Sequence, residues 1–203
     1  MNSSITGVVL PIRSFRMAKK RLVPHLAPRQ REQLALSMAD IVAKACAGLT
    51  TVVVHDDLDV GVWAVDHGFS SLHAPGVGLN GAAQLGAGLL RDRCSMIAVV
   101  HADLPFADSV ERLVTDGAIT LVADRHGTGT NAVIFPSATP FDFSFGPGSF
   151  AKHVAAGEQT GLVVLTPDDE QFQFDIDTLD DLAAAHEWVS ANLPWAVPTG
   201  FSR

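Results

Sequence analysis

This sequence has few cysteines and no long apolar run. Among its 203 residues only Cys46 and Cys94 are cysteines, which is too few for a disulfide framework. No apolar stretch approaches the roughly 20 residues that a membrane-spanning helix needs, and no signal peptide is recognisable. We therefore expect a soluble, cytoplasmic protein with reduced thiols and no membrane partner.

Positive charge is also scarce. The chain has 14 Lys and Arg residues against 22 Asp and Glu, a net charge of −8, and no basic tract longer than Lys19-Lys20-Arg21. This balance argues against nucleic acid or an anionic membrane surface as the main partner. A small anionic ligand stays compatible with the sequence, because a local cluster of cations is enough to hold one.

Several familiar catalytic patterns are missing. The sequence contains no Walker A motif, no nucleophile elbow and no Cys–His arrangement. Its eight histidines show no metal-ligand spacing, so we expect structural roles for them. Only His101 and His126 lie in loops where they could also touch a ligand.

The chain alternates short apolar, β-branched segments with helical patterns, and 47% of its residues are hydrophobic, enough for one sizeable core. The expected strands are Gly7–Ile12, Thr50–His55, Phe69–His73, Ser95–His101, Ile119–Ala123, Ala132–Phe135, Leu162–Leu165 and Phe172–Asp175. The expected helices are Pro28–Ala45, Leu58–Asp66, Leu79–Leu90, Ser109–Asp116, Phe150–Gln159 and Thr178–Asn192. This alternation predicts an α/β fold with a mostly parallel sheet, as a single domain of residues 1–193 followed by a C-terminal tail, 194–203.

Three aspartates form the most informative pattern. Asp175-Ile176-Asp177 ends one apolar run, and Asp103 closely follows another. Within a strand, Asp175 and Asp177 would point to the same side and aim two carboxylates at one place. Mg²⁺ prefers such oxygen ligands, often combined with phosphate, so the pattern indicates a metal–phosphate site. The pair alone is equally compatible with a helix cap and a solvated turn.

A cationic loop follows the first expected strand. Its charged residues are Arg13, Arg16, Lys19, Lys20 and Arg21. Arginine binds phosphate oxygens with a fork of donors, and lysine supplies a compact charge, so this loop suits a triphosphate. The alternative is a basic loop that is merely solvated.

The loop Gly76–Gly81 matches the pattern G-x-G-x-x-G between a strand and a helix. Asp103 lies about twenty residues beyond the match to the pattern, as in dinucleotide-binding proteins, which leaves an NAD(P)-dependent oxidoreductase open. The pattern normally follows the first strand, whereas here two expected strands precede it. The glycines could also serve turn geometry alone.

Two further loops can bind anions. Asp124-Arg125-His126-Gly127-Thr128-Gly129-Thr130-Asn131 offers backbone N–H groups and hydroxyls that can cradle an anion. Phe145-Gly146-Pro147-Gly148-Ser149-Phe150 runs into a helix, and the N-terminus of a helix is a ready phosphate site. Ser149 could cap that helix, with or without a ligand.

These segments together resemble one family. The strings Pro11-Ile12-Arg13, Ala18-Lys19-Lys20-Arg21-Leu22, Gly78-Leu79-Asn80 and Ala102-Asp103-Leu104-Pro105, followed by 124–131, 145–150 and 175–178, occur in the order seen in phospholactate/phosphoenolpyruvate guanylyltransferases of coenzyme F420 biosynthesis. The strings at 124–131 and 145–150 are specific, whereas D-x-D and the Gly-rich loop occur in many nucleotidyltransferases. Arg13 stands where the family has lysine, and His101 where it has a small residue or proline.

The resemblance implies a three-layer α/β/α fold like that of nucleotide-diphospho-sugar transferases, and a guanylyl transfer from GTP to a small phosphorylated C3 acid. Mg²⁺ would be the cofactor, and no general base is needed because a phosphate acceptor is already an anion. The implied residues are Asp103, Asp175 and Asp177 as metal ligands; Arg13, Lys19 and Arg21 at the triphosphate, with Lys19 and Arg21 also catalytic; Gly78 and Asn80 at the nucleoside; and Thr130, Gly146 and Ser149 at the acceptor.

The acceptor and the alternatives are separate questions. The cations are mostly arginine and the helices are rich in alanine, which suggests a GC-rich bacterial genome, and bacterial members of the family are associated with phosphoenolpyruvate rather than 2-phospho-L-lactate or 3-phosphoglycerate. Besides the oxidoreductase, a non-catalytic nucleotide-binding module stays open, although three retained acids and a cationic loop speak against it. The oligomeric state is not indicated.

Overall fold

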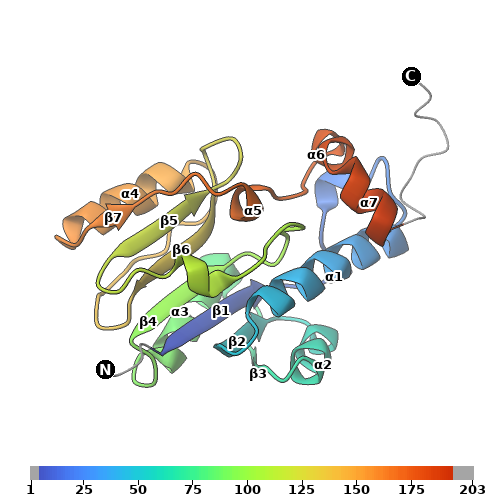
Figure 1. The fold of residues 1–203 in the computed structure, drawn as a ribbon. Helices are drawn as coiled ribbons and strands as arrows, with labels where there is room; N and C mark the ends of the chain where they lie inside the picture. The colour runs from blue at the N-terminus through green and yellow to red at the C-terminus, as the bar shows by residue number, and fades with distance from the viewer. Residues whose placement is uncertain (1–4, 194–203) are drawn as a thin grey trace.

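The computed structural model describes residues 5–193, which form a seven-stranded sheet with helices on both faces (Figure 1). The strands are β1 (Thr6–Ile12), β2 (Thr50–His55), β3 (Ser70–His73), β4 (Met96–Val100), β5 (Ile119–Ala123), β6 (Thr130–Pro136) and β7 (Val164–Leu165). The helices are α1 (Pro28–Ala45), α2 (Leu58–Asp66), α3 (Gly78–Leu90), α4 (Ser149–Gln159), α5 (Glu170–Gln173), α6 (Leu179–Ala184) and α7 (His186–Asn192), with short 3₁₀ helices η1 (Lys20–Leu22) and η2 (Val110–Leu113).

The strand order is β3-β2-β1-β4-β6-β5-β7. Strand β6 runs antiparallel to β4 and β5, and the other neighbours pair in parallel. Strands β1, β2, β3 and β4 therefore all end on the same side of the sheet. Ligands bind beyond the C-terminal ends of the strands in folds of this kind.

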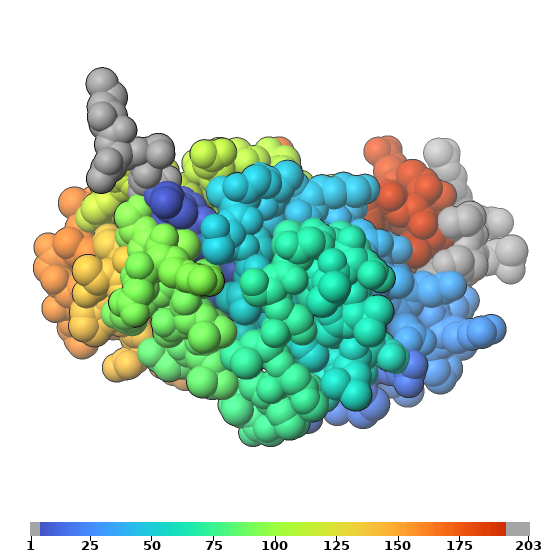
Figure 2. Space-filling model, turned by 90° about the horizontal axis from the view of Figure 1, so that it is seen from below, coloured from blue at the N-terminus to red at the C-terminus, as the bar shows by residue number. Residues whose placement is uncertain are grey.

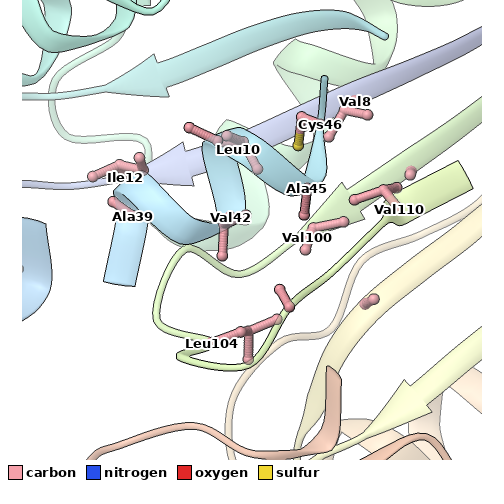
Figure 3. Close-up of a cluster of buried hydrophobic side chains, with 14 of the residues drawn as sticks. Val8, Leu10, Ile12, Ala39, Val42, Ala45, Cys46, Val100, Leu104 and Val110 are labelled. Carbon is pink, nitrogen blue, oxygen red and sulfur yellow. The ribbon is translucent and has the colours of Figure 1, made fainter. Parts of the chain in front are cut away.

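Alternation along the strands supplies a core on each face of the sheet. In β1, Val8, Leu10 and Ile12 are buried on the face that α1 covers with residues such as Val42 (Figure 3). Val9 points to the opposite face, where α3 and α4 pack. Gly86 lets α3 come close to β1, because a Cβ atom built there would lie 2.3 Å from Cγ1 of Val9. These two cores confirm the predicted three-layer α/β/α fold.

A third apolar cluster joins the end of the described chain to its beginning. Helices α6 and α7 pack beside η1 and the first half of α1, at the end of the molecule opposite α4 and β7 (Figures 1 and 2). Ile176, the central residue of the D-x-D segment, is fully buried in this cluster with Leu22 and Leu34. Because Ile176 packs against Leu22, the D-x-D segment lies beside the cationic loop that follows β1, although the two are far apart in the sequence.

Three expectations about the elements are wrong. Segment 172–175 is not a strand, because the side chain of Asp169 accepts a hydrogen bond from Phe172 N at 3.1 Å and starts the short helix α5 there. Segment 109–116 forms only η2, since Val114 adopts an extended backbone. The expected helix 178–192 is two helices divided at Ala185.

The other boundaries shift by a few residues. Strand β6 begins two residues earlier than expected, and β7 comprises only Val164 and Leu165. The predicted tail 194–203 lies outside the described residues. Within residues 5–193 no helix has the length and apolar character needed to cross a bilayer.

Candidate active site

A cleft of about 270 Å³ opens at the shared C-terminal edge of the strands. It brings together four of the segments singled out in the sequence: the loop after β1, the start of α3, the end of β4 and the D-x-D segment. The residues with predicted roles that line it are Arg13, Lys19, Asp103 and Asp177. The sheet thus gathers groups that are far apart in the sequence into one place.

The three predicted metal ligands converge although their segment is not a strand. One carboxylate oxygen from each of Asp103, Asp175 and Asp177 lies within 4.8 Å of the other two. Asp177 does not cap α6, because Thr178 is the N-cap and its side chain accepts from Asp181 N. The cap-and-turn alternative for D-x-D is therefore incorrect for Asp177. The buried side chain of Ile176 anchors the segment between the two acids, of which Asp177 lines the cleft.

Lys19 lies among these acids. Its Nζ atom lies 2.7 Å from Oδ2 of Asp103 and 2.9 Å from Oδ1 of Asp177, while its side chain is only 4% exposed. Lys19 has φ of 52°, the only positive value for a residue other than glycine between residues 5 and 193. The left-handed region costs a residue with a side chain about 1–2 kcal/mol. The fold therefore maintains a strained backbone where it delivers this ammonium group.

The charges at this place are strongly coupled. Burial lowers the pKa of Lys19, but Asp103 and Asp177 more than offset it, so the pKa lies above its ordinary value. Burial raises the pKa of Asp103, and Lys19 reverses that effect to leave it lowered. Asp175 makes no such contact with Lys19: burial and the charges of Asp103 and Asp177 raise its pKa to about 7. One carboxylate with a lowered pKa, Asp103, and one with a raised pKa, Asp175, thus belong to the same cluster.

Two buried polar atoms beside the cleft lack a hydrogen-bond partner within the described part of the chain. They are Oδ1 of Asp103 and Nε2 of His101. An unpartnered carboxylate oxygen beside two further carboxylates suits a hard cation, since Mg²⁺ and Mn²⁺ bind through oxygen. These residues therefore fit a divalent metal ion, with Lys19 as a competing cation.

The two arginines assigned to the triphosphate lie near the cleft with their side chains largely in solvent. Arg13 is 78% exposed, and its Nε donates to Asp56 at 3.0 Å. Arg21 is 74% exposed and lies 3.4 Å from Asp177. Both guanidinium groups can still bind an anion, because exposed ion pairs are weak and exchange readily. Their assignment stays a prediction.

The predicted acceptor residues lie on a second set of loops. Thr130 is buried at the start of β6, where its hydroxyl lies 2.9 Å from Nδ1 of His153. Nε2 of His153 accepts from Ser144 N at 2.9 Å, so Nδ1 carries the proton and donates to Thr130. The hydroxyl proton of Thr130 is thereby left for another acceptor. Burial lowers the pKa of His153 to about 4, which keeps the ring neutral.

Ser149 does not cap α4, contrary to one expectation. The N-cap is Gly148, with φ of 69° and no side chain to form a hydrogen bond, and Gly146 has φ of 128°. Ser149 is the first helical residue and is 1% exposed. The loop thus needs glycine at both positions, and it is closed by hydrogen bonds from Ser149 N to Gly146 O at 3.0 Å and from Phe150 N to Thr128 O at 3.2 Å.

Asn80 makes a contact that the sequence did not suggest. Its Oδ1 accepts from Phe145 N at 2.7 Å, and its Nδ2 donates to Phe145 O at 3.3 Å. The ring of Phe145 in turn lies 5.0 Å from that of His101 and 4.8 Å from that of His153. Asn80, predicted to approach the nucleoside, therefore also fastens the acceptor loop to α3. Gly78, in the same turn, has φ of 68°, which requires glycine.

Arg125 and Asp181 were also missed as site residues. The guanidinium of Arg125 pairs with Asp181, which is 3% exposed, and lies over the ring of Phe174 at 5.0 Å. Oδ2 of Asp181 also accepts a hydrogen bond from the backbone N–H of Asp177 at 2.9 Å. The T-x-x-D spacing from Thr178 was a usable signal, because that spacing marks a helix start.

Comparisons with known proteins show the family and the fold to which this chain is similar. Residues 6–186 match the family described as "Guanylyl transferase CofC like". A phosphoenolpyruvate guanylyltransferase of Sphaerobacter thermophilus is 36% identical over 199 residues, covering 92% of this chain and 96% of that protein. A 2-phospho-L-lactate guanylyltransferase of Methanothermobacter thermautotrophicus is 30% identical over 185 residues, covering 87% and 82%. A solved Desulfovibrio desulfuricans G20 protein, assigned to the nucleotide-diphospho-sugar transferases, has the same fold, with a TM-score of 0.73 at 14% identity and coverage of 92% and 88%.

The two alternative functions find no support. The Gly76–Gly81 loop follows β3, which lies at the edge of the sheet, whereas a dinucleotide fingerprint follows the first strand. The relatives are named as transferases rather than oxidoreductases or binding proteins.

Proposed function

This chain belongs to the CofC-like guanylyl transferases, and from that membership and its site we propose that it joins GMP to the phosphate of phosphoenolpyruvate, releasing pyrophosphate, in coenzyme F420 biosynthesis. The observation that carries the proposal is the convergence of Asp103, Asp175 and Asp177 beside the ammonium of Lys19. Anionic substrates need cations, and a carboxylate cluster recruits one to meet them.

The reaction needs positioning and charge neutralisation more than proton transfer. A phosphate oxygen of the acceptor attacks the α-phosphorus of GTP, a new P–O bond forms, and the bond to the β-phosphate oxygen breaks to release pyrophosphate. The attacking oxygen is already anionic, so the reaction requires no general base to remove a proton from it. A bound Mg²⁺ ion would neutralise phosphate charge in the transition state. Asp103, Asp175 and Asp177 would hold it.

The protein's own cations would handle the triphosphate. Lys19 is buried at the carboxylates of Asp103 and Asp177, and its ammonium group would bind a phosphate oxygen of the triphosphate there. Arg13 lines the cleft and Arg21 lies 3.4 Å from Asp177, both with side chains largely in solvent, and they would hold the departing pyrophosphate.

The acceptor acid would be bound across the Gly-rich loops. The hydroxyl of Ser149, at the positive end of the α4 dipole, and the hydroxyl of Thr130 are suited to a phosphate or carboxylate. These groups recognise features that phosphoenolpyruvate and 2-phospho-L-lactate share. Our preference for phosphoenolpyruvate follows the name of the 36% identical relative.

A direct assay tests the proposal. The protein is incubated with GTP, Mg²⁺ and equal concentrations of phosphoenolpyruvate, 2-phospho-L-lactate and 3-phosphoglycerate, and pyrophosphate and product masses are measured. We expect one pyrophosphate per guanylylated phosphoenolpyruvate and no turnover in EDTA. Guanylylated phospholactate as the main product would overturn only the acceptor. Absence of pyrophosphate with all three acids would overturn the guanylyl transfer.

A further inference from the structure

We infer that Arg125 and Asp181 are positioning residues that set the geometry of the D-x-D carboxylates for the metal ion. The inference rests on the proposed function, because it concerns the metal ligands Asp175 and Asp177. Neither Arg125 nor Asp181 is a member of the carboxylate cluster itself.

Asp181 makes more hydrogen bonds than a helix cap requires. Its Oδ2 accepts from Thr178 N at 2.7 Å, which is one contact of the capping box, and from Thr178 Oγ1 at 2.8 Å. The same oxygen also accepts from Asp177 N at 2.9 Å. This third bond fixes the peptide group of a predicted metal ligand. Oδ1 of Asp181 is left for Arg125.

Arg125 holds the D-x-D segment from both sides. Toward the C-terminus its Nη2 donates to Asp181, and toward the N-terminus its guanidinium lies over the ring of Phe174 at 5.0 Å. Asp175, Ile176 and Asp177 lie between these two contacts. Because Ile176 is also fully buried, the segment is fastened at its middle and at both ends.

The string 124–131 therefore has a structural task beside its predicted anion contacts. Asn131, which ends the string, donates from Nδ2 to Phe172 O and Gln173 O, at 3.0 Å each, just before the D-x-D segment. Thr128 O, in the middle, accepts from Phe150 N at the start of α4. One loop thus contacts both the segment of the metal ligands and the helix predicted to bind the acceptor.

Residues that orient metal ligands typically change metal affinity by about 10- to 100-fold when they are altered. We expect this loss in Asp181→Asn, which keeps the shape but removes the charge that faces Arg125. We expect it also in Arg125→Lys, which keeps the charge but loses the planar fork and the contact with Phe174. The double variant should lose little more than either single variant, because both act through one contact.

Two controls separate positioning from simple stabilisation of α6. Thr178→Ala removes a capping hydroxyl but leaves the bond from Asp177 N to Asp181, and Asp180→Asn alters the exposed neighbour on the same helix. Thr178→Ala should lower the Tm as much as Asp181→Asn does, yet leave the affinity for Mn²⁺ within about twofold of wild type. Asp180→Asn should change neither quantity.

The experiment measures Mn²⁺ binding to the full-length protein by electron paramagnetic resonance, with Tm and the Mg²⁺ dependence of pyrophosphate release in parallel. Weaker Mn²⁺ binding in Asp181→Asn and Arg125→Lys, with turnover largely restored by high Mg²⁺, supports the inference. If both variants keep the wild-type Mn²⁺ affinity, or if Thr178→Ala loses as much Mn²⁺ affinity as they do, the positioning role is overturned while the proposed guanylyl transfer stands. Asp177→Asn should abolish the Mn²⁺ binding seen in wild-type protein. If wild-type protein binds no Mn²⁺, or if Asp177→Asn binds it equally well, the proposed metal site is wrong and the inference fails with it.

Discussion

The Nζ atom of Lys19 lies 2.7 Å from Oδ2 of Asp103, although 84 residues separate the two in the sequence. Asp177 completes the arrangement from a third segment, at 2.9 Å from the same ammonium. The ammonium group of Lys19 therefore already neutralises part of the negative charge of the predicted metal ligands. A divalent metal ion bound at these acids would compete with Lys19 for the same carboxylates, and substitutions on either side test this.

Asp103→Asn should reduce pyrophosphate release by at least about 100-fold while preserving the fold. The amide removes one negative charge at the metal but can still accept a hydrogen bond from Lys19. Pyrophosphate release at saturating Mg²⁺ and thermal unfolding are measured together, with the exposed Asp92→Asn as the matched control. Wild-type turnover in Asp103→Asn would contradict the metal assignment, whereas a large fall in Tm would point to a structural acid.

Lys19→Ala should affect GTP and the metal in opposite directions. The KM for GTP should rise by about tenfold or more, because a charge-assisted contact to phosphate is lost. Mg²⁺ should bind the substrate-free protein more tightly, since its competitor is gone. The backbone strain at residue 19 is unchanged, because alanine also disfavours positive φ.

Steady-state kinetics and Mn²⁺ titration measure the two effects of Lys19→Ala, with the exposed neighbour Lys20→Ala as control. Equal rises in KM for GTP and for the acid would show that Lys19 supports the whole site rather than the triphosphate. Unchanged or weaker Mn²⁺ binding would show that the ammonium does not compete with the metal ion.

Asn80→Ala should weaken acceptor binding as well as GTP binding. The side chain of Asn80 holds both backbone groups of Phe145, so its removal frees the loop that leads into α4. Loss of two hydrogen bonds of this kind costs about 1–3 kcal/mol. A purely nucleoside role predicts a change in KM for GTP alone. The KM values for GTP and for the acceptor acid distinguish a purely nucleoside role from a role in holding the loop. Gln84→Ala, at an exposed position on the same helix, is the control.

The stability of the fold should fall between pH 6.5 and pH 4 partly because of His153. Burial lowers the pKa of His153 from 6.5 to about 4, so the unfolded chain binds a proton over this range that the folded chain does not. Stability is therefore present above the unfolded pKa and is lost as the pH falls, by at most about 3 kcal/mol. His101 and Lys152 contribute further positive potential at the ring.

Chemical denaturation across that pH range measures this effect. His153→Phe should be less stable at pH 7, because Ser144 N and Thr130 lose their partner, yet its stability should depend less on pH. The exposed His126→Gln should keep the wild-type slope. An equally steep loss of stability in His153→Phe would assign the slope to other groups.

Much of this protein was determined by local patterns in its sequence. Short apolar, β-branched segments and helical patterns placed most elements correctly, because those signals depend on neighbours in the chain. The candidate site was also found from the sequence, since ligand-binding loops follow the C-terminal ends of parallel strands. The segment 172–175 was misassigned because the side chain of Asp169, outside the apolar pattern, starts a helix there.

Only the tertiary structure decided how the site is held together. Ile176 is an ordinary apolar residue in the sequence, and its burial against α1, η1 and α6 anchors the segment in which Asp177 contacts Lys19. Asn80 binding Phe145 and Arg125 binding Asp181 join segments more than 50 residues apart, at separations of 65 and 56. Such contacts depend on how distant elements pack, and periodicity and spacing carry no record of that packing.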